Sequence, residues 1–309
     1  MKETKFGGYT IELGAIRIQG IRNDETQEEN PIWTLAQKHK LTSINSDYDD
    51  LLTYDQNGWV NYLDVVYRAF THVDQVLEDA ERRETSNLED LSFAQALGLH
   101  GWTPKTSYER VAEWSAFDLN TGDTPSATSM IQTAINDKMT LDYWSDEEQF
   151  VTDQRGYATP VREEAKLLAA GHSILYNSTV TIVTYTSNLV NITLENGLII
   201  MADYVICTFS IGVLQHNDAQ FIPQFPAWKR ESIFTFKMVT FTKVFLQFPY
   251  KFWNDTQFFL YADPYRRGYY PFWQSLSEIG FFPGSNIICV ILLSPIKLIL
   301  LNRKVTIRL

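Results

Sequence analysis

Apolar side chains recur at helical spacing through much of residues 30–120. The stretch 59–82 has apolar residues three and four positions apart, which places them on one helix face. These residues are Leu63, Val66, Phe70, Val73 and Leu77. Asn30 and Pro31 predict the start of another helix, since Asn suits the N-cap and Pro the first helical position. Further helices are predicted over 87–97 and 108–117.

The pattern becomes that of strands after about residue 178. Residues 179–185 alternate and are rich in β-branched side chains. Two apolar runs flank Asn196-Gly197, and Asn-Gly in that setting is a strong signal for a hairpin. Alternation over 239–248 puts five side chains on one face, namely Val239, Phe241, Lys243, Phe245 and Gln247. Other strands are predicted at 9–13, 205–209, 258–262 and 269–274.

A helical block between β segments predicts a mixed α/β and α+β fold with two interlocked domains. The 309 residues are enough for one large domain or two ordinary ones. Hydrophobic residues make up 45% and charged residues 20%, which is typical of a globular protein. The aromatic content of 14% suits a pocket for flat or cationic ligands, or simply an aromatic-rich core.

The net charge of −11 argues against nucleic acid as a partner and is compatible with a basic small molecule. The two cysteines and five histidines follow no metal-binding spacing, so no metal and no disulfide framework are expected. The apolar stretch 287–301 is interrupted by Pro295 and Lys297 and is shorter than the ~20 residues of a membrane span, so no membrane association is expected. No signal peptide is apparent, and the compartment stays open.

Six segments, in order, resemble the flavin-containing polyamine oxidases, most closely the fungal ones. They are FGGYTIELGAIRIQG (6–20), ENPIWTLAQKHKL (29–41), VTDQRGY (151–157), ADYVICTFSIGVLQ (202–215), FTKVFLQFPYKFW (241–253) and FFLYADPYRRGYYPFWQS (258–275). The resemblance implies a doubly wound FAD-binding domain interlocked with a substrate domain of sheet and helices. It also implies an oxidoreductase of polyamine catabolism, which transfers a hydride from the amine α-carbon to flavin N5 and releases hydrogen peroxide. FAD, an amine substrate and oxygen are the expected partners.

The resemblance divides the chain approximately into parts of two domains. Residues 1–42 and 151–222 are predicted to be a remnant of the FAD-binding domain. Residues 43–150 and 223–290 are predicted to form the substrate-binding domain, and 291–309 an atypical tail.

Lys243 is the predicted catalytic residue. It shares a strand face with Phe241 and Phe245. Burying a lysine on such an apolar face costs free energy unless the ammonium has a partner or contacts water. The resemblance implies that it holds a water against flavin N5, and that Phe241 lines the substrate tunnel. The alternatives are an edge-strand lysine that prevents aggregation and a core phenylalanine.

Gln19 and Asp123 are the other predicted substrate-binding residues. Gln19 ends GAIRIQG, where the family pattern is closer to GANWVEG or GANWVQG; it can accept a hydrogen bond from an ammonium but brings no charge. Arg17 stands where the family has Trp, and Ile16 where it has Asn, which argues against family-like polyamine binding. Asp123 would pair with a distal ammonium, or is a turn aspartate beside Gly122.

Three residues are predicted to contact the cofactor through their backbone. Gly14 and Ala15 match the segment that runs along the flavin, and Val180 matches a valine that contacts the adenosine end. The alternative for Val180 is an ordinary strand residue.

Two family features are missing from the sequence, so we expect a chain truncated at both ends. No G-x-G-x-x-G turn, which would cradle the FAD pyrophosphate, is present. No segment after Ser285 matches the C-terminal Gly-Glu pair of complete members. The expected consequence is weak or absent FAD binding, and the alternative function is an inactive oxidase-like fragment.

Overall fold

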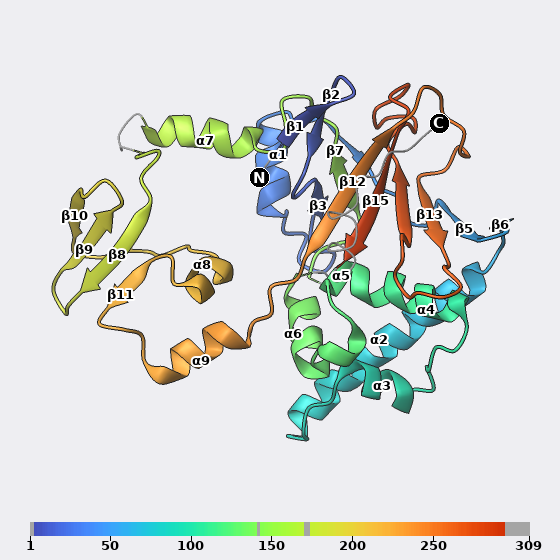
Figure 1. The fold of residues 1–309 in the computed structure, drawn as a ribbon, viewed down its shortest axis with the longest axis horizontal. Helices are drawn as coiled ribbons and strands as arrows, with labels where there is room; N and C mark the ends of the chain where they lie inside the picture. The colour runs from blue at the N-terminus through green and yellow to red at the C-terminus, as the bar shows by residue number, and fades with distance from the viewer. Residues whose placement is uncertain (1–2, 141–142, 170–173, 294–309) are drawn as a thin grey trace. The chain divides into compact units, whose positions relative to one another are not determined.

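The computed structural model describes residues 3–140, 143–169 and 174–293 (Figure 1). The chain divides into two compact units: residues 1–165 together with 240–309, and residues 166–239. Each unit is described by itself. The mixed α/β character predicted from the sequence is confirmed, whereas the predicted division into cofactor and substrate domains stays a prediction.

A six-stranded mixed sheet forms the framework of the larger unit. Its strand order is β12-β15-β14-β13-β5-β6, and only the β13–β5 pair is parallel. The strands are β5 (Leu51–Asp55), β6 (Gly58–Trp59), β12 (Phe241–Gln247), β13 (Phe258–Tyr261), β14 (Phe272–Ser275) and β15 (Ile287–Leu293).

Helices cover one face of this sheet (Figure 1). They are α2 (Leu63–Thr85), α3 (Phe93–Leu99), α4 (Ser107–Glu113), a π-helix (Trp114–Asp118), α5 (Leu119–Thr121), a 3-10 turn (Pro125–Ala127) and α6 (Met130–Thr140). The core between the two layers joins helical residues such as Val76 and Phe117 to Phe258, Leu260 and Phe272 of the sheet. Burial of these large side chains is the main stabilising contribution to the unit.

Two small antiparallel sheets complete the larger unit. One pairs β1 (Glu3–Phe6) with β2 (Tyr9–Glu12), and the other has the order β3-β7-β4. Its strands are β3 (Arg17–Gln19), β4 (Ser43–Asn45) and β7 (Glu148–Val151). Helix α1 (Pro31–Lys38) begins as predicted, because the Asn30 side chain accepts a hydrogen bond from the Ile32 amide. Helix α7 (Thr159–Ala169) follows β7.

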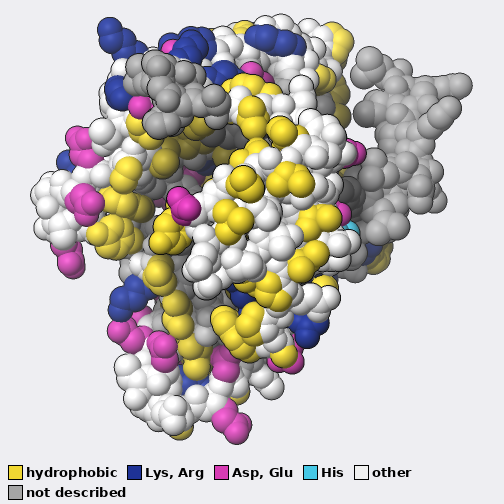
Figure 2. Space-filling view, turned by 90° about the vertical axis from the view of Figure 1, so that its left-hand side faces the viewer, with side chains coloured by type: hydrophobic (Ala, Val, Ile, Leu, Met, Phe, Trp, Pro, Cys, Tyr) yellow, Lys and Arg dark blue, Asp and Glu magenta, His cyan; other side chains and the backbone are white. Residues whose placement is uncertain are grey.

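The smaller unit contains a four-stranded sheet of order β10-β9-β8-β11. Its elements are β8 (Val180–Tyr185), β9 (Val190–Leu194), β10 (Ile199–Ala202), α8 (Ile211–His216), β11 (Gln220–Ile222) and α9 (Ala227–Thr235). The predicted hairpin is confirmed: β9 and β10 pair antiparallel, and Gly197 has a φ of +83°. Hydrophobic side chains are frequent on the face of the molecule in Figure 2. By solvent exposure alone, the large hydrophobic side chains exposed in the smaller unit include Met201, Ile206, Phe234 and Met238.

Three predicted elements differ from the structure. Residues 205–209 form no strand; most of their side chains are exposed, and no described strand pairs with them.

Helix α2 begins at Leu63, because Gly58 and Trp59 belong to β6. Phe70, expected on its buried face, is 39% exposed, while Ala69 and Val76 are buried. Helix α3 begins at Phe93, since Ser92 and Gln95 form a capping box.

Strand β15 was absent from the predicted elements. All seven of its residues are buried, because it lies between β12 and β14 in the sheet interior. A strand covered on both faces has no alternating pattern, so its sequence reads only as an apolar run. The predicted atypical tail starts at residue 291, inside this strand, and residues 294–309 lie outside the described residues.

In the described part of the chain, no helix combines the length and hydropathy needed to cross a membrane. The same residues contain no group of three or more side chains placed to hold a metal ion.

Candidate active site

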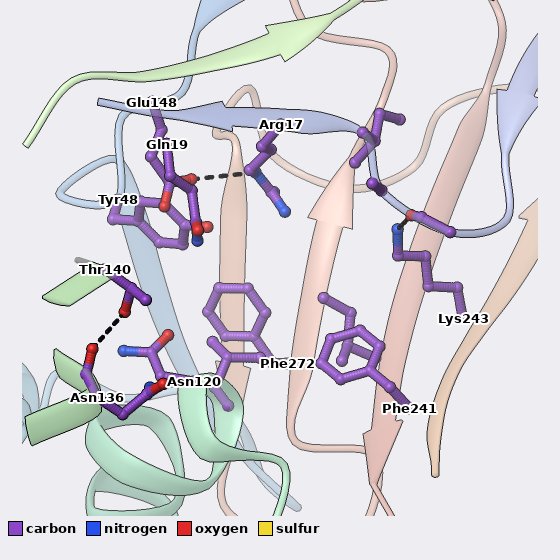
Figure 3. A pocket seen from close by; sticks show the side chains of 15 residues that line it. Arg17, Gln19, Tyr48, Asn120, Asn136, Thr140, Glu148, Phe241, Lys243 and Phe272 are labelled. Atoms are coloured by element: carbon purple, nitrogen blue, oxygen red, sulfur yellow. Dashed lines mark hydrogen bonds and ion pairs between the residues drawn. The ribbon is translucent and has the colours of Figure 1, made fainter. Parts of the chain in front are cut away.

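A cavity of about 480 Å³ opens in the larger unit, on the sheet face that carries the helices (Figure 3). Its walls come from the segment leading into β3, from β7, β12, β14 and β15, and from the α5 and α6 region. The lining residues are Gly14, Ala15, Ile16, Arg17, Gln19, Tyr48, Leu119, Asn120, Asn136, Thr140, Glu148, Phe241, Lys243, Phe272 and Ile291.

Lys243 lies on the helix-covered face of β12, opposite Ile291 of β15. Its Nζ donates a hydrogen bond of 2.7 Å to the carbonyl oxygen of Gly14. Burial lowers the pKa of this ammonium below its ordinary value, and the positive charge of Arg17 lowers the pKa further. A lysine with a lowered pKa in a cavity is a candidate functional group.

Gly14 and Ala15 form an exposed segment between β2 and β3. A Cβ atom added to Gly14 would meet no heavy atom within 4 Å, so open space lies beside this backbone. Open space beside this backbone and a hydrogen-bonding lysine suit the approach of a planar ring such as a flavin. The residues present at this wall of the cavity therefore fit the expected cofactor.

Gln19 and Phe241 also line the cavity, on β3 and at the start of β12. The backbone carbonyl of Gln19 is held by Asn30 Nδ2 at 3.0 Å, while its side chain is exposed. Phe241 is 46% exposed, so it belongs to the wall rather than to the core. The structure thus brings five of the seven predicted site residues together around one cavity.

The other two predicted residues do not line this cavity. Asp123 follows the C-terminal Gly122 of α5, and its Oδ1 accepts a hydrogen bond of 2.8 Å from the Thr124 amide, as in a turn. Val180 is the first residue of β8 in the smaller unit. Their substrate and cofactor roles stay predictions.

Arg17 carries a second positive charge into the cavity (Figure 3). Its Nε lies 3.3 Å from Glu148 Oε2, and its Nη2 donates a hydrogen bond of 2.9 Å to Gln274 Oε1. The guanidinium also lies 5.6 Å from the centre of the Tyr48 ring. Burial raises the pKa of the Tyr48 hydroxyl above its ordinary value.

Several lining residues were not recognised in the sequence, above all Tyr48, Asn120 and Glu148. The only signal for Glu148 is its place in a run of three acidic residues, 146–148, which is a common surface pattern. Its contact with Arg17 depends on the antiparallel pairing of β3 and β7, since Gln19 lies opposite Glu148.

The π-helix places Leu119 and Asn120 at the cavity wall. Arg267 fixes this turn: its guanidinium binds Asp118 at 2.5 and 2.7 Å and Glu113 at 2.9 Å. All three side chains are largely buried. Such π-turns are rare and are frequently found next to functional sites.

A mixed α/β scaffold with a lysine-containing cavity is typical of an enzyme that acts on small molecules. Comparison with known families defines the class further, because the model for flavin containing amine oxidoreductases matches residues 1–293. The chain belongs to this family. The match extends past Ser285, and it includes strand β15.

Plant polyamine oxidases are among its relatives. Polyamine oxidase 1 of Zea mays is 32% identical over 312 residues, which cover 94% of this chain and 61% of that protein. Polyamine oxidase 6 of Oryza sativa subsp. japonica is 31% identical with the same coverage. The chain thus spans about 61% of the length of these relatives. The motifs predict a resemblance that is strongest to the fungal enzymes, and these plant relatives do not support that prediction.

The fold is similar to that of a putrescine oxidase variant redesigned in its cofactor binding. The TM-score is 0.69 with 10% sequence identity, over 98% of this chain and 69% of that one. At this identity the likeness concerns the fold alone.

Proposed function

We propose that this chain provides the substrate cavity of an FAD-dependent oxidase of polyamines or related amines. FAD would accept the hydride from the carbon next to the amine nitrogen and pass the electrons to oxygen. The imine product would hydrolyse, and hydrogen peroxide would be released. The observation that carries the proposal is the position of Lys243 beside the open backbone of Gly14, in a member of a flavin-containing family.

The roles of the residues follow from their positions. The backbone of Gly14 and Ala15 would lie along the flavin, and Val180 would contact its adenosine end. Lys243 would hold a water through its Nζ where oxygen is reduced, since its lowered pKa helps it exchange a proton. Phe241 would orient the amine, and Gln19 would accept a hydrogen bond from it.

Substitution of Lys243 by methionine tests this proposal. Methionine keeps the length of the side chain but removes its charge and its protons. After loading with FAD, we expect the wild-type chain to release peroxide when an amine is added, and the Lys243→Met chain to do so about a hundredfold more slowly. An Amplex-type peroxide assay measures both rates.

Lys105→Met is the matched control, because Lys105 is exposed and lies outside the cavity. Equal peroxide rates for Lys243→Met and Lys105→Met would contradict the role of Lys243. A wild-type chain that neither retains FAD nor releases peroxide would instead support the alternative, an inactive oxidase-like fragment.

A further inference from the structure

A second cavity, of about 690 Å³, lies on the face of the six-stranded sheet opposite the helices. Along β13 and β14, Phe258 and Phe272 pack against the helices. The alternate residues Phe259 and Trp273 therefore lie on the other face, where they line this second cavity. We call it the aromatic cavity. The sheet separates it from the candidate active site, which lies on the helix-covered face.

Aromatic side chains make up eight of the twelve residues that line the aromatic cavity. The Phe252 ring is inclined by 87° to that of Phe248 and by 84° to that of Trp253. The rings of Tyr270 and Trp273 lie within 26° of parallel, with their centres 6.4 Å apart. Phe252 is 65% exposed, so a ligand with an apolar body would bury surface that now contacts water. The faces of such rings also attract cations.

Asp55 is the only charged residue among the described residues that line the aromatic cavity. Its Oδ1 accepts a hydrogen bond of 2.7 Å from the Asn57 amide, and its Oδ2 accepts one of 2.8 Å from the Tyr108 hydroxyl. Burial raises the pKa of the Tyr261 hydroxyl, and the carboxylates of Asp263 and Asp55 raise that pKa further. The charge at this wall of the aromatic cavity is therefore negative.

Two cations that neighbour the lining residues in the sequence are engaged elsewhere. Arg266 stacks on the ring of Tyr269, 3.7 Å from its centre. Lys251 Nζ lies 2.6 Å from a carboxylate oxygen of Asp255 and 2.6 Å from one of Glu278. Neither cation lines the aromatic cavity, so the charge of Asp55 is left for a ligand to balance.

The polar atoms of the aromatic cavity do not suit an ammonium that has several N–H groups. Both Asp55 oxygens already accept a hydrogen bond, and Asn254 Oδ1 accepts one of 3.1 Å from the Tyr54 hydroxyl. A primary ammonium has three N–H donors, and each needs an acceptor when it leaves water. A fully alkylated nitrogen has no N–H donor, and its alkyl groups can pack against aromatic rings.

We propose that the aromatic cavity binds an organic cation with a fully alkylated nitrogen. The alkyl groups lie against the aromatic rings, and the carboxylate of Asp55 balances the charge. This binding site lies across the sheet from the candidate active site and does not depend on the proposed amine oxidation.

The test compares choline with 3,3-dimethylbutan-1-ol by calorimetric titration of the full chain. The two molecules have the same shape, but a carbon atom replaces the charged nitrogen in the second. We expect choline to bind about tenfold more tightly than this neutral probe, because only choline is attracted by the rings and by Asp55. Ethanolamine, the primary-ammonium counterpart of choline, should also bind about tenfold more weakly than choline.

Variants of two lining residues separate the contributions of ring and charge. Phe252→Leu removes an exposed ring and should weaken choline binding several-fold, whereas Trp59→Leu, at a 64% exposed residue outside the aromatic cavity, should not. Asp55→Asn should remove most of the preference for choline over the neutral probe. Asp64→Asn is its control, because that side chain is 79% exposed and lies outside the aromatic cavity.

Equal affinities for choline and the neutral probe, or binding of neither, would overturn the inference. Unchanged choline binding in Phe252→Leu and Asp55→Asn chains that melt like the wild type would also overturn it. Ethanolamine binding as tightly as choline would contradict the assigned class of cation. None of these results depends on peroxide release, so failure of the proposed oxidase function is detected separately.

Discussion

Lys243 and Arg17 are two cations in one cavity of an acidic chain, and each has a specific environment. Lys243 donates to the carbonyl of Gly14, and Arg17 lies against Glu148. Burial disfavours the charged form of Lys243, and the guanidinium of Arg17 acts in the same direction, whereas Cys289 and Glu12 oppose them. The side chain therefore releases its proton more readily than an ordinary surface lysine.

The lowered pKa of Lys243 should make the unfolding free energy of the chain depend on pH. Because the unfolded chain binds this proton more tightly, wild-type stability rises with pH between the lowered pKa and the ordinary value of about 10.4. Lys243→Met lacks this rise, so its stability relative to wild type is greatest near neutral pH and declines at alkaline pH. Urea unfolding at a series of pH values measures the difference.

Lys105→Met serves as the control, since its side chain is exposed. Its stability should follow the wild-type pH dependence throughout. A Lys243→Met profile parallel to the wild type would show that the folded chain leaves this pKa unchanged.

At the scale of elements, the π-helix and β15 place the cavity walls. The π-helix brings Leu119 and Asn120 to the cavity, and β15 contributes Ile291 opposite Lys243. The π-helix depends on Arg267, whose guanidinium neutralises the carboxylates of Glu113 and Asp118.

Removal of Arg267 should destabilise the chain strongly. In Arg267→Ala, the two acidic side chains lose their cation while they stay buried, which costs about 3–5 kcal/mol of unfolding free energy. Arg266→Ala, at the neighbouring position, should cost within about 0.5 kcal/mol, since Arg266 only stacks on Tyr269 at the surface. Equal losses in urea unfolding would contradict the role of Arg267.

Elements with local signals could be predicted from the sequence. The cap at Asn30, the Asn-Gly turn and the alternation in β12 each lead to the observed element. Strand β15 could not be recognised, because a strand buried on both faces lacks alternation. The apolar run 205–209 predicts a strand that the structure does not contain, because apolar composition alone does not supply a pairing partner.

At the scale of the whole molecule, the order of six motifs indicated the family, and the match over residues 1–293 confirms it. Lys243 and Gly14 are far apart in the sequence but lie within a hydrogen bond of each other. The resemblance anticipated that they share a site. It did not anticipate Glu148 beside Arg17, because this pair depends on the register between β3 and β7.

We propose that this cavity belongs to a flavin-dependent amine oxidase, and anaerobic titration tests this proposal most directly. The chain is loaded with FAD, freed of unbound cofactor and mixed with an amine in the absence of oxygen. We predict that the visible absorption band of the bound flavin bleaches when the amine is added and returns with oxygen. A chain that elutes without flavin, or whose flavin band is unchanged by every amine tried, would contradict the claim.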